Sequence, residues 1–216
     1  NINKIEEIPF LPIQFFKSRK VIGKGNAPEI IFKSSGTTET GRSQHFVADL
    51  YLYQQSFTKG FEAAYGDIYN TCIIALLPNY QEQGDSSLIY MIDSLIEQSG
   101  NSKSGFYLNE KNILLETLLE LKKSKTKTLL IGVTYALLDF IEKQNIDFSN
   151  LIVMETGGMK GRRKEIVREE LHEILRDGFG VSTIHSEYGM TELLSQAYSF
   201  GNGVFKTPSW MKILTR

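Results

Sequence analysis

The chain has 216 residues, of which 41% are hydrophobic, and 24 basic residues nearly balance 25 acidic ones. This composition is typical of a globular protein with a sizeable apolar core. The near-zero net charge argues against nucleic acid as a partner and against electrostatic attachment to a membrane. A lone cysteine, Cys72, cannot form an internal disulfide, and no stretch reaches the roughly 18 apolar residues of a membrane span. A cytoplasmic protein that acts on small molecules or on other proteins fits these observations best.

Short apolar runs alternate with longer amphipathic segments along the chain. The short runs predict buried strands, and they are residues 29–32, 71–78, 128–133, 151–155 and 181–184. The longer segments carry apolar residues three and four positions apart, which predicts helices, and they are residues 44–65, 86–98, 110–124, 135–144 and 164–177. Residues 196–206 predict a β-hairpin around Asn202 and Gly203.

This alternation of strands and helices predicts an α/β fold. We expect a mainly parallel β-sheet flanked by helices, in three layers, with the β-hairpin at its C-terminal end. No internal repeat or linker is visible, so residues 1–216 are expected to form a single α/β region. Ligands of such sheets bind beyond the carboxyl ends of the strands, which directs attention to the segments that follow each strand.

The first such segment, "SSGTTETGRS" (34–43), has two interpretations as a phosphate loop. Counted from Gly36, it is one letter short of the Walker loop of P-loop NTPases, with Arg42 at the position of the lysine. Arginine is not equivalent to lysine at such a crowded loop. The strand 151–155 also ends on Glu155 rather than on the aspartate usual in P-loop enzymes.

In the second interpretation, the serine, threonine and glycine residues from Ser34 onward supply backbone amides and hydroxyls to a phosphate. A simpler alternative is a polar turn in which Ser43 caps the helix predicted after it. The loop alone does not decide between these possibilities.

Two later segments favour the second interpretation. Gly157 and Gly158 follow a predicted strand, where the absence of side chains lets a flat ring approach the backbone, although a tight turn would also need glycine. In "YGMTE" (188–192), Tyr188 could stack on a base, Thr191 could donate to a phosphate and Glu192 could hold Mg²⁺. The alternative is that Thr191 and Glu192 merely begin a helix.

Together, "SSGTTETGRSQH", "TGG" and "YGMTE" occur in an order that resembles the adenylate-forming superfamily of acyl-CoA synthetases, luciferases and peptide-synthetase adenylation domains. The chain as a whole is most similar to the acyl-protein synthetase branch, the bacterial LuxE-like proteins. The resemblance covers nearly all of the chain. It implies that residues 1–216 are part of the large N-terminal domain of such an enzyme, whose C-terminal domain is absent.

The resemblance also implies an activity and a set of site residues. An enzyme of this kind activates a carboxylic acid, here a fatty acid, with ATP and Mg²⁺ to an acyl-adenylate and passes the acyl group to a thiol of a protein cysteine or of CoA. The ATP phosphates would contact Ser34, Ser35, Gly36, Thr37 and Thr38, with Arg42 near the usual lysine. Gly157, Gly158, Tyr188 and Gly189 would surround the adenine, Thr191 would touch the α-phosphate, and Glu192 would coordinate Mg²⁺.

Some residues depart from the superfamily pattern. Glu39 replaces a common glycine and brings negative charge near a polyphosphate, while Asn79 and Tyr80 indicate a modified acyl pocket. Cys72 lies within an apolar run, so we expect a buried, inert thiol rather than an acyl acceptor. A non-catalytic nucleotide-binding or interaction module on the same scaffold is the main alternative function, and a degenerate P-loop NTPase is another. For the adenylation function, the loop 34–43, the turn 156–158 and the box 188–192 have to meet in one cleft.

Overall fold

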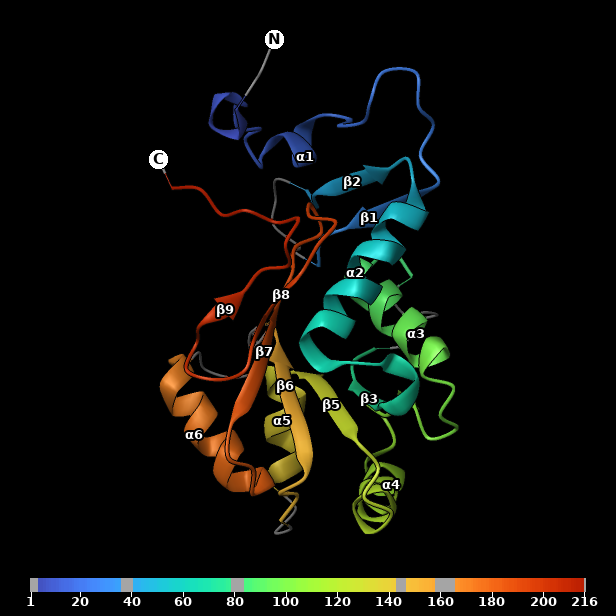
Figure 1. Cartoon of the computed structure of the whole chain (residues 1–216), viewed down its shortest axis with the longest axis vertical. Helices are drawn as coiled ribbons and strands as arrows, with labels where there is room; N and C mark the ends of the chain where they lie inside the picture. Colours follow the sequence, from blue (N-terminus) through green and yellow to red (C-terminus); the bar gives the residue numbers. More distant parts are fainter. Residues whose placement is uncertain (1–3, 36–40, 79–83, 143–146, 158–165, 216) are drawn as a thin grey trace.

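The computed structural model describes residues 4–35, 41–78, 84–142, 147–157 and 166–215 (Figure 1). Within these residues, seven strands form one sheet in the order β4-β3-β5-β6-β7-β8-β9. The strands are β3 (Cys72–Leu76), β4 (Gly105–Phe106), β5 (Thr128–Val133), β6 (Leu151–Thr156), β7 (Ile184–Tyr188), β8 (Ala197–Ser199) and β9 (Phe205–Lys206). The strands from β4 to β7 pair in parallel, whereas β8 and β9 are antiparallel.

The strand order places a change of direction in the middle of the sheet. From β3 the chain runs outward to β4 and then returns to β5 on the other side of β3, from which it continues to β6 and β7. This is one of the two common doubly wound orders, in which ligands bind at the carboxyl ends of the strands near the reversal. The sheet therefore directs attention to the carboxyl ends of its parallel strands, on the side where β3 and β5 end.

Helices cover both faces of this sheet, as the predicted three-layer α/β fold requires. They are α2 (Leu50–Tyr65), α3 (Ser87–Ser99), α4 (Lys111–Lys123), α5 (Thr134–Ile141) and α6 (Arg168–Phe179). The short helix α1 (Phe15–Ser18) lies apart from this sheet, against residues 44–47, and short 3₁₀ turns lie at Ile5–Glu7 and Ile68–Asn70. On β7, His185 contacts Tyr65 of α2, whereas the next residue, Ser186, accepts a hydrogen bond from Arg168 of α6. Because successive side chains of a strand point to opposite faces, α2 and α6 lie on opposite sides of the sheet.

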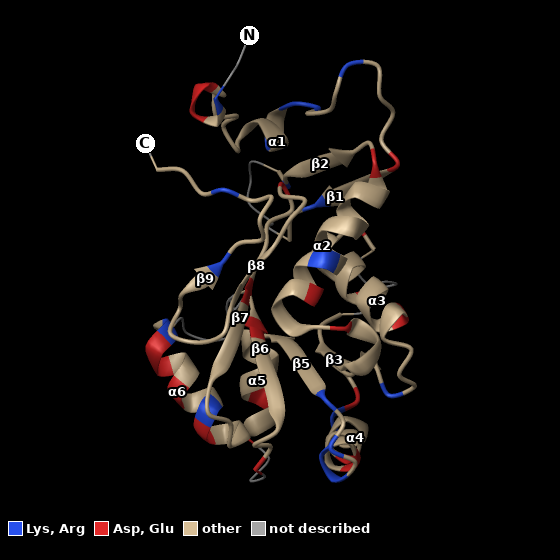
Figure 2. Ribbon diagram, viewed as in Figure 1, with Lys and Arg blue, Asp and Glu red and all other residues tan. Residues whose placement is uncertain are grey.

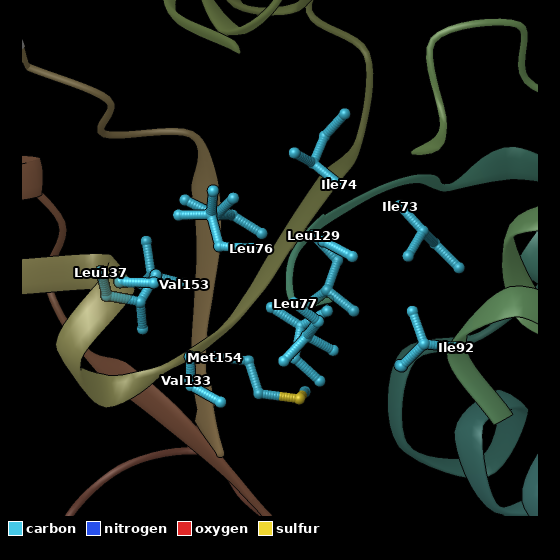
Figure 3. Packing of buried hydrophobic residues seen from close by; sticks show 14 of the residues in the cluster. Ile73, Ile74, Leu76, Leu77, Ile92, Leu129, Val133, Leu137, Val153 and Met154 are labelled. Atoms are coloured by element: carbon cyan, nitrogen blue, oxygen red, sulfur yellow. The ribbon is translucent and has the colours of Figure 1, made fainter. Parts of the chain in front are cut away.

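The core lies between the sheet and these helices. All residues of β3 and β5 are buried, because both strands are central and are covered on both faces. Figure 3 shows Leu129, Leu76 and Met154 from three neighbouring strands packed in one cluster, with Ile92 of α3 nearby. Cys72, at the start of β3, is completely buried, and burial raises the pKa of its thiol. Those properties belong to an inert core cysteine.

The structure corrects two predictions near the phosphate loop. Residues 29–32 were expected to join the parallel sheet, but β1 (Ile30–Lys33) pairs instead with β2 (Gln44–Val47) in a separate antiparallel ribbon. The helix predicted over residues 44–65 therefore begins with a strand. Helix α2 starts only after Asp49, whose carboxylate accepts a hydrogen bond from the amide of Leu52. Strand pairing and this N-cap outweigh the apolar periodicity that runs through the segment.

A third correction concerns the strand predicted over residues 181–184. Strand β7 begins only at Ile184 and continues to Tyr188, so it lies almost entirely after the predicted strand and reaches the first residue of the "YGMTE" box. Helix α6 ends at Phe179 with Gly180 in a left-handed C-cap, which delays the strand. The polar residues of β7 alternate between the two faces of the sheet, and this polarity hid the strand from an analysis that looked for apolar runs.

The C-terminal hairpin is confirmed. Strands β8 and β9 pair around a turn in which Asn202 and Gly203 have φ values of 56° and 66°. These positive values suit asparagine and glycine, the residues that favour such turns.

Among the helices that the structure describes, none is long and apolar enough to cross a membrane.

Candidate functional site

A cavity of about 750 Å³ lies at the carboxyl ends of β3, β6 and β7, beside the N-terminus of α3 and the base of the β1–β2 loop. Each of the three motif segments contributes to its wall. The described residues that were predicted from these motifs and that line the cavity are Ser35, Arg42, Gly157, Gly189 and Thr191. The predicted contacts Gly36, Thr37, Thr38 and Gly158 lie outside the described residues, as do Glu39, Asn79 and Tyr80. Three segments that are far apart in the sequence thus meet at one cavity.

The base of the β1–β2 loop is closed by Ser34. Its amide donates to the carbonyl of Ser43 over 3.0 Å, and its hydroxyl accepts from the Ser43 amide, also over 3.0 Å. Ser34 therefore holds the two ends of the loop together, and Ser35 is the residue that reaches the cavity. A Walker loop joins a strand of the parallel sheet to a helix, whereas this loop joins two antiparallel strands. The geometry does not match a P-loop NTPase.

Arg42 extends from the end of this loop to Asp85, just before α3. Its guanidinium forms a two-pronged ion pair with the Asp85 carboxylate, with Nη1 2.8 Å from Oδ2 and Nη2 3.1 Å from Oδ1. Its Nε donates to the carbonyl of Ser34. The hydrogen bond from Arg42 is the main reason that the pKa of Asp85 lies below its ordinary value. Because Lys33 also lies 3.7 Å from Asp85, two cations face one carboxylate, and this part of the wall keeps an excess positive charge.

The "YGMTE" segment is attached to the same ribbon through its backbone. Nδ1 of His45, on β2, lies 2.8 Å from the carbonyl oxygen of Thr191. A carbonyl can only accept, so His45 carries its proton on Nδ1. Burial lowers the pKa of His45, although the bond to Thr191 and the charge of nearby Glu192 act in the opposite direction. The contact fixes Thr191 at the cavity wall and places Glu192 within electrostatic range of His45.

Tyr188 and Glu192 are near the cavity but do not line it. The ring of Tyr188 packs edge-on against Phe205, 6.1 Å between centroids, and 42% of the residue is exposed. Tyr188 is therefore partly open to solvent. Glu192 is half-buried and forms no ion pair within the described part of the chain. Its carboxylate is available for a cation that is held jointly with a ligand.

The sequence analysis missed the polar inner wall of the cavity, which is formed by Tyr53, Thr156, Glu187 and Gln196. Thr156 donates a hydrogen bond of 2.7 Å to the Glu187 carboxylate. Burial raises the pKa of Glu187 to about 7. A charged residue at an inward strand position, one residue before the motif, was the signal that could have revealed this wall. The predicted strand ended at residue 184, so Glu187 was not expected at a strand position.

Glu155, the other acidic residue of the central strands, has a different environment. Figure 2 shows the strands of the sheet largely free of charge, with acidic positions on β6 and β7. Glu187 faces α2 and the cavity, whereas Glu155 faces α6, where Nη1 of Arg168 lies 3.2 Å from its Oε1. Glu155 is thus part of a structural ion pair and does not line the cavity. This arrangement gives no support to a magnesium-binding role for Glu155.

The described residues fit a nucleotide and a metal ion in chemical terms. The excess positive charge at Arg42 and Lys33 and the hydroxyls of Ser35 and Thr191 suit phosphate oxygens. Among the residues that the structure describes, no three histidine, cysteine, aspartate or glutamate side chains gather as a metal site. Mg²⁺ in phosphate-transferring sites is usually held by one or two carboxylates together with the phosphates of the substrate, and Glu192 supplies one such carboxylate.

Comparisons with known proteins give structural likenesses but no match by sequence family. No protein-family model matches the chain, and no curated protein matches it. Among solved structures, it is similar to coronafacic acid ligase from Pectobacterium brasiliense, with a TM-score of 0.47, 17% identity, and coverage of 68% of this chain and 28% of the ligase. It is also similar to a point mutant of that ligase, with a TM-score of 0.42, 21% identity, and coverage of 60% and 24%. The chain spans about a quarter of the length of these ligases, and a likeness of this degree does not assign an activity to it.

Proposed function

We propose that the cavity binds ATP together with a carboxylic acid and activates the acid as an acyl-adenylate. The observation that carries this proposal is the meeting of Ser35, Gly157 and Thr191, from three separate motif segments, at one cavity. The carboxyl ends of parallel strands are where such folds bind their ligands. The order of the motifs resembles that of adenylate-forming enzymes, and this resemblance supports adenylation as the reaction. The two cations beside Asp85 give it a charge suited to phosphate.

The chemistry is a displacement at phosphorus. An oxygen of the carboxylate attacks the α-phosphorus of ATP, the bond from that phosphorus to the bridging oxygen breaks, and pyrophosphate leaves with the bonding electrons. Negative charge is redistributed over the phosphate oxygens during this step, so fixed donors and cations lower its barrier. Mg²⁺ bound with the nucleotide supplies Lewis-acid stabilisation of the phosphate charge. The carboxylate of Glu192 would hold that ion.

In this proposal each wall of the cavity has a role. The hydroxyl of Thr191 donates to the α-phosphate, and the base of the β1–β2 loop, including Ser35, holds the outer phosphates. Arg42 adds positive charge while Asp85 fixes its position. Gly157 borders the adenine, and the exposed ring of Tyr188 is available to stack on it.

The later steps are also proposals. We infer that the acyl group passes to a thiol of CoA or of a protein cysteine, as the resemblance to acyl-protein synthetases implies. Cys72 is not that acceptor, because it is fully buried in β3. Residues 1–216 are then a single α/β region that belongs to the large N-terminal domain of an adenylate-forming enzyme. A fatty acid is the substrate that the sequence resemblance suggests.

Acid-dependent exchange of labelled pyrophosphate into ATP, measured on the natural full-length protein, tests the proposal. A panel of short, long and functionalised carboxylic acids should reveal at least one acid that drives exchange. Thr191→Val removes the hydroxyl and keeps the shape, and it should lower the exchange rate about a hundredfold if that hydroxyl is a preorganised donor. Thr183→Val is the matched control, because Thr183 is exposed and lies outside the cavity.

Two results would contradict the proposal. Release of inorganic phosphate from ATP without pyrophosphate exchange would indicate an NTPase. Binding of ATP without exchange for any acid in the panel would indicate a nucleotide-binding module without adenylation activity.

A further inference from the structure

The inner wall of the cavity carries two largely buried side chains with hydrogen-bond acceptors that the proposed adenylation chemistry does not use. They belong to Glu187 on β7 and to Gln196 just before β8, which are 9% and 6% exposed. Both residues line the cavity. Within the described residues, no hydrogen bond or ion pair joins either of them to the charged Lys33 and Arg42 side chains, and both lie close to Gly189.

The orientation of the Gln196 amide follows from its neighbour Tyr53. The hydroxyl of Tyr53 donates its proton to the carbonyl of Ser87 over 3.1 Å. Its oxygen can therefore only accept from Gln196, whose Nε2 lies 3.2 Å away. This bond turns the amide oxygen Oε1 away from Tyr53. Oε1 is buried and has no hydrogen-bond donor within the described part of the chain.

Glu187 presents a second free acceptor close by. Its Oε2 accepts the hydroxyl proton of Thr156, and within the described residues no donor reaches Oε1. Gly189 makes room for this oxygen. A Cβ at Gly189 would lie 2.5 Å from Oε1 of Glu187 and 3.6 Å from Cγ of Gln196, so both side chains flank the same glycine. Burial also raises the pKa of Glu187 to about 7, as expected for a carboxyl group without a charged partner.

Unpaired buried acceptors are rare in proteins, because burial removes their hydrogen bonds to water and no protein donor replaces them. An apolar chain against this wall would leave both oxygens unsatisfied. A group with N–H or O–H donors would satisfy them, and a protonated amine would also neutralise Glu187. Leu77 and Met91, which also line the cavity, provide apolar side chains for a short hydrocarbon stem.

We propose that the acid activated in this cavity carries an amino or hydroxyl group, which donates hydrogen bonds to Glu187 and Gln196. This inference rests on the proposed adenylation function and names its substrate class. The substrate is a functionalised acid rather than the plain fatty acid that the sequence resemblance suggests. Glu187 and Gln196 determine specificity and take no part in the chemical step.

Matched series of acids test this inference on the full-length protein. Straight-chain alkanoic acids of about three to eight carbons are compared with their ω-hydroxy and ω-amino counterparts of the same length. The specificity constant for pyrophosphate exchange and the dissociation constant from calorimetry are measured for each acid. At the best chain length, a donor-bearing acid should exceed the alkanoic acid by about tenfold or more in both quantities.

Substitutions then locate the preference. Gln196→Met keeps the length of the side chain and removes the amide, and Glu187→Gln replaces an acceptor oxygen by a donor. Each should reduce the preference for the donor-bearing acid to within about threefold of unity, because the oxygen that favours a donor has been removed. Gln98→Met and Glu116→Gln make the same chemical changes at exposed positions outside the cavity and should leave the preference intact. Circular dichroism establishes that each variant is folded.

The outcomes separate this inference from the proposed function. Exchange or binding that is equal for the alkanoic acids, or stronger for them, would overturn the inference and leave adenylation standing. Absence of exchange with every acid would overturn the adenylation proposal, and calorimetry would still decide whether the wall selects donor-bearing acids. A preference that survives both Gln196→Met and Glu187→Gln would also overturn the inference.

Discussion

The substitution Glu187→Gln is expected to change how the stability of the protein depends on pH. Glu187 is 9% exposed, and burial raises its pKa from the ordinary value of 4.5 to about 7. In the folded protein the carboxyl group therefore keeps a proton that the unfolded chain releases between these two values. The stability that this group contributes is fully present below pH 4.5 and is lost as the pH rises through 7.

The size of the effect follows from the two pKa values. The interval between 4.5 and about 7, at about 1.4 kcal/mol for each pH unit, corresponds to about 3 to 4 kcal/mol in the free energy of unfolding. Glutamine has no proton to lose in this range. The unfolded chain has already released most of this proton at pH 5, so the stability of the wild type relative to Glu187→Gln should fall by about 2 to 3 kcal/mol between pH 5 and pH 8.

Urea denaturation, followed by circular dichroism at several values between pH 5 and pH 8, measures this difference. Comparison with the variant cancels the contributions of other titrating groups. Glu116→Gln, at an exposed position, is the matched control and should show almost no dependence on pH relative to the wild type. If the difference between the wild type and Glu187→Gln is the same at pH 5 and at pH 8, Glu187 is ionised throughout and the description of the inner wall is wrong.

Three further substitutions test other parts of the account. In the full-length protein, Glu192→Gln removes the charge proposed to hold Mg²⁺ and should lower pyrophosphate exchange by about two orders of magnitude, so a variant with normal exchange would contradict that role. Cys72→Ala changes only a buried strand residue, so it should lower the free energy of unfolding by roughly 1 kcal/mol with little effect on pyrophosphate exchange. Loss of acyl transfer in the folded variant would instead make Cys72 the acceptor. Asp49→Ala removes the N-cap of α2, whose carboxylate lies 3.0 Å from the amide of Leu52, and should cost about 1 kcal/mol in urea denaturation; an unchanged midpoint would show that the cap contributes nothing.

The central part of the fold was predictable because its strands are buried on both faces. Strand β5 (Thr128–Val133) and strand β3 (Cys72–Leu76) coincide closely with continuous apolar runs in the sequence. The predicted helix over residues 110–124 likewise matches α4 to within one residue at each end. In these segments local pattern and tertiary packing favour the same structure.

The errors arose where pairing with a distant segment decides the structure. Strand β2 carries an apolar pattern that continues into α2, and only its partner β1 makes it a strand. Strand β7 is polar because each of its faces meets other polar groups, Arg168 on one side and the cavity on the other. Single-sequence patterns carry no information about such partners.

The candidate site was predictable in part for the same reason. Short motifs identified Ser35, Gly157 and Thr191, because the spacing of small and hydroxyl-bearing residues is visible in the sequence. The contact between Thr156 and Glu187 depends on the register of β6 and β7, which places adjacent strand ends side by side. The free amide oxygen of Gln196 depends on a bond to Tyr53, which is far away in the chain. These features emerge only from the folded arrangement.

A crystal structure of the full-length protein with a stable acyl-adenylate mimic, in which a sulfamate replaces the phosphate, tests the central claim most directly. We expect the mimic to occupy the cavity at the carboxyl ends of β3, β6 and β7. Its sulfamate should lie within hydrogen-bonding distance of Thr191, and its acyl group should point toward Glu187 and Gln196. A mimic bound elsewhere on the protein, or a cavity that stays empty at a saturating concentration of the mimic, would contradict the assignment of this cavity to acid activation.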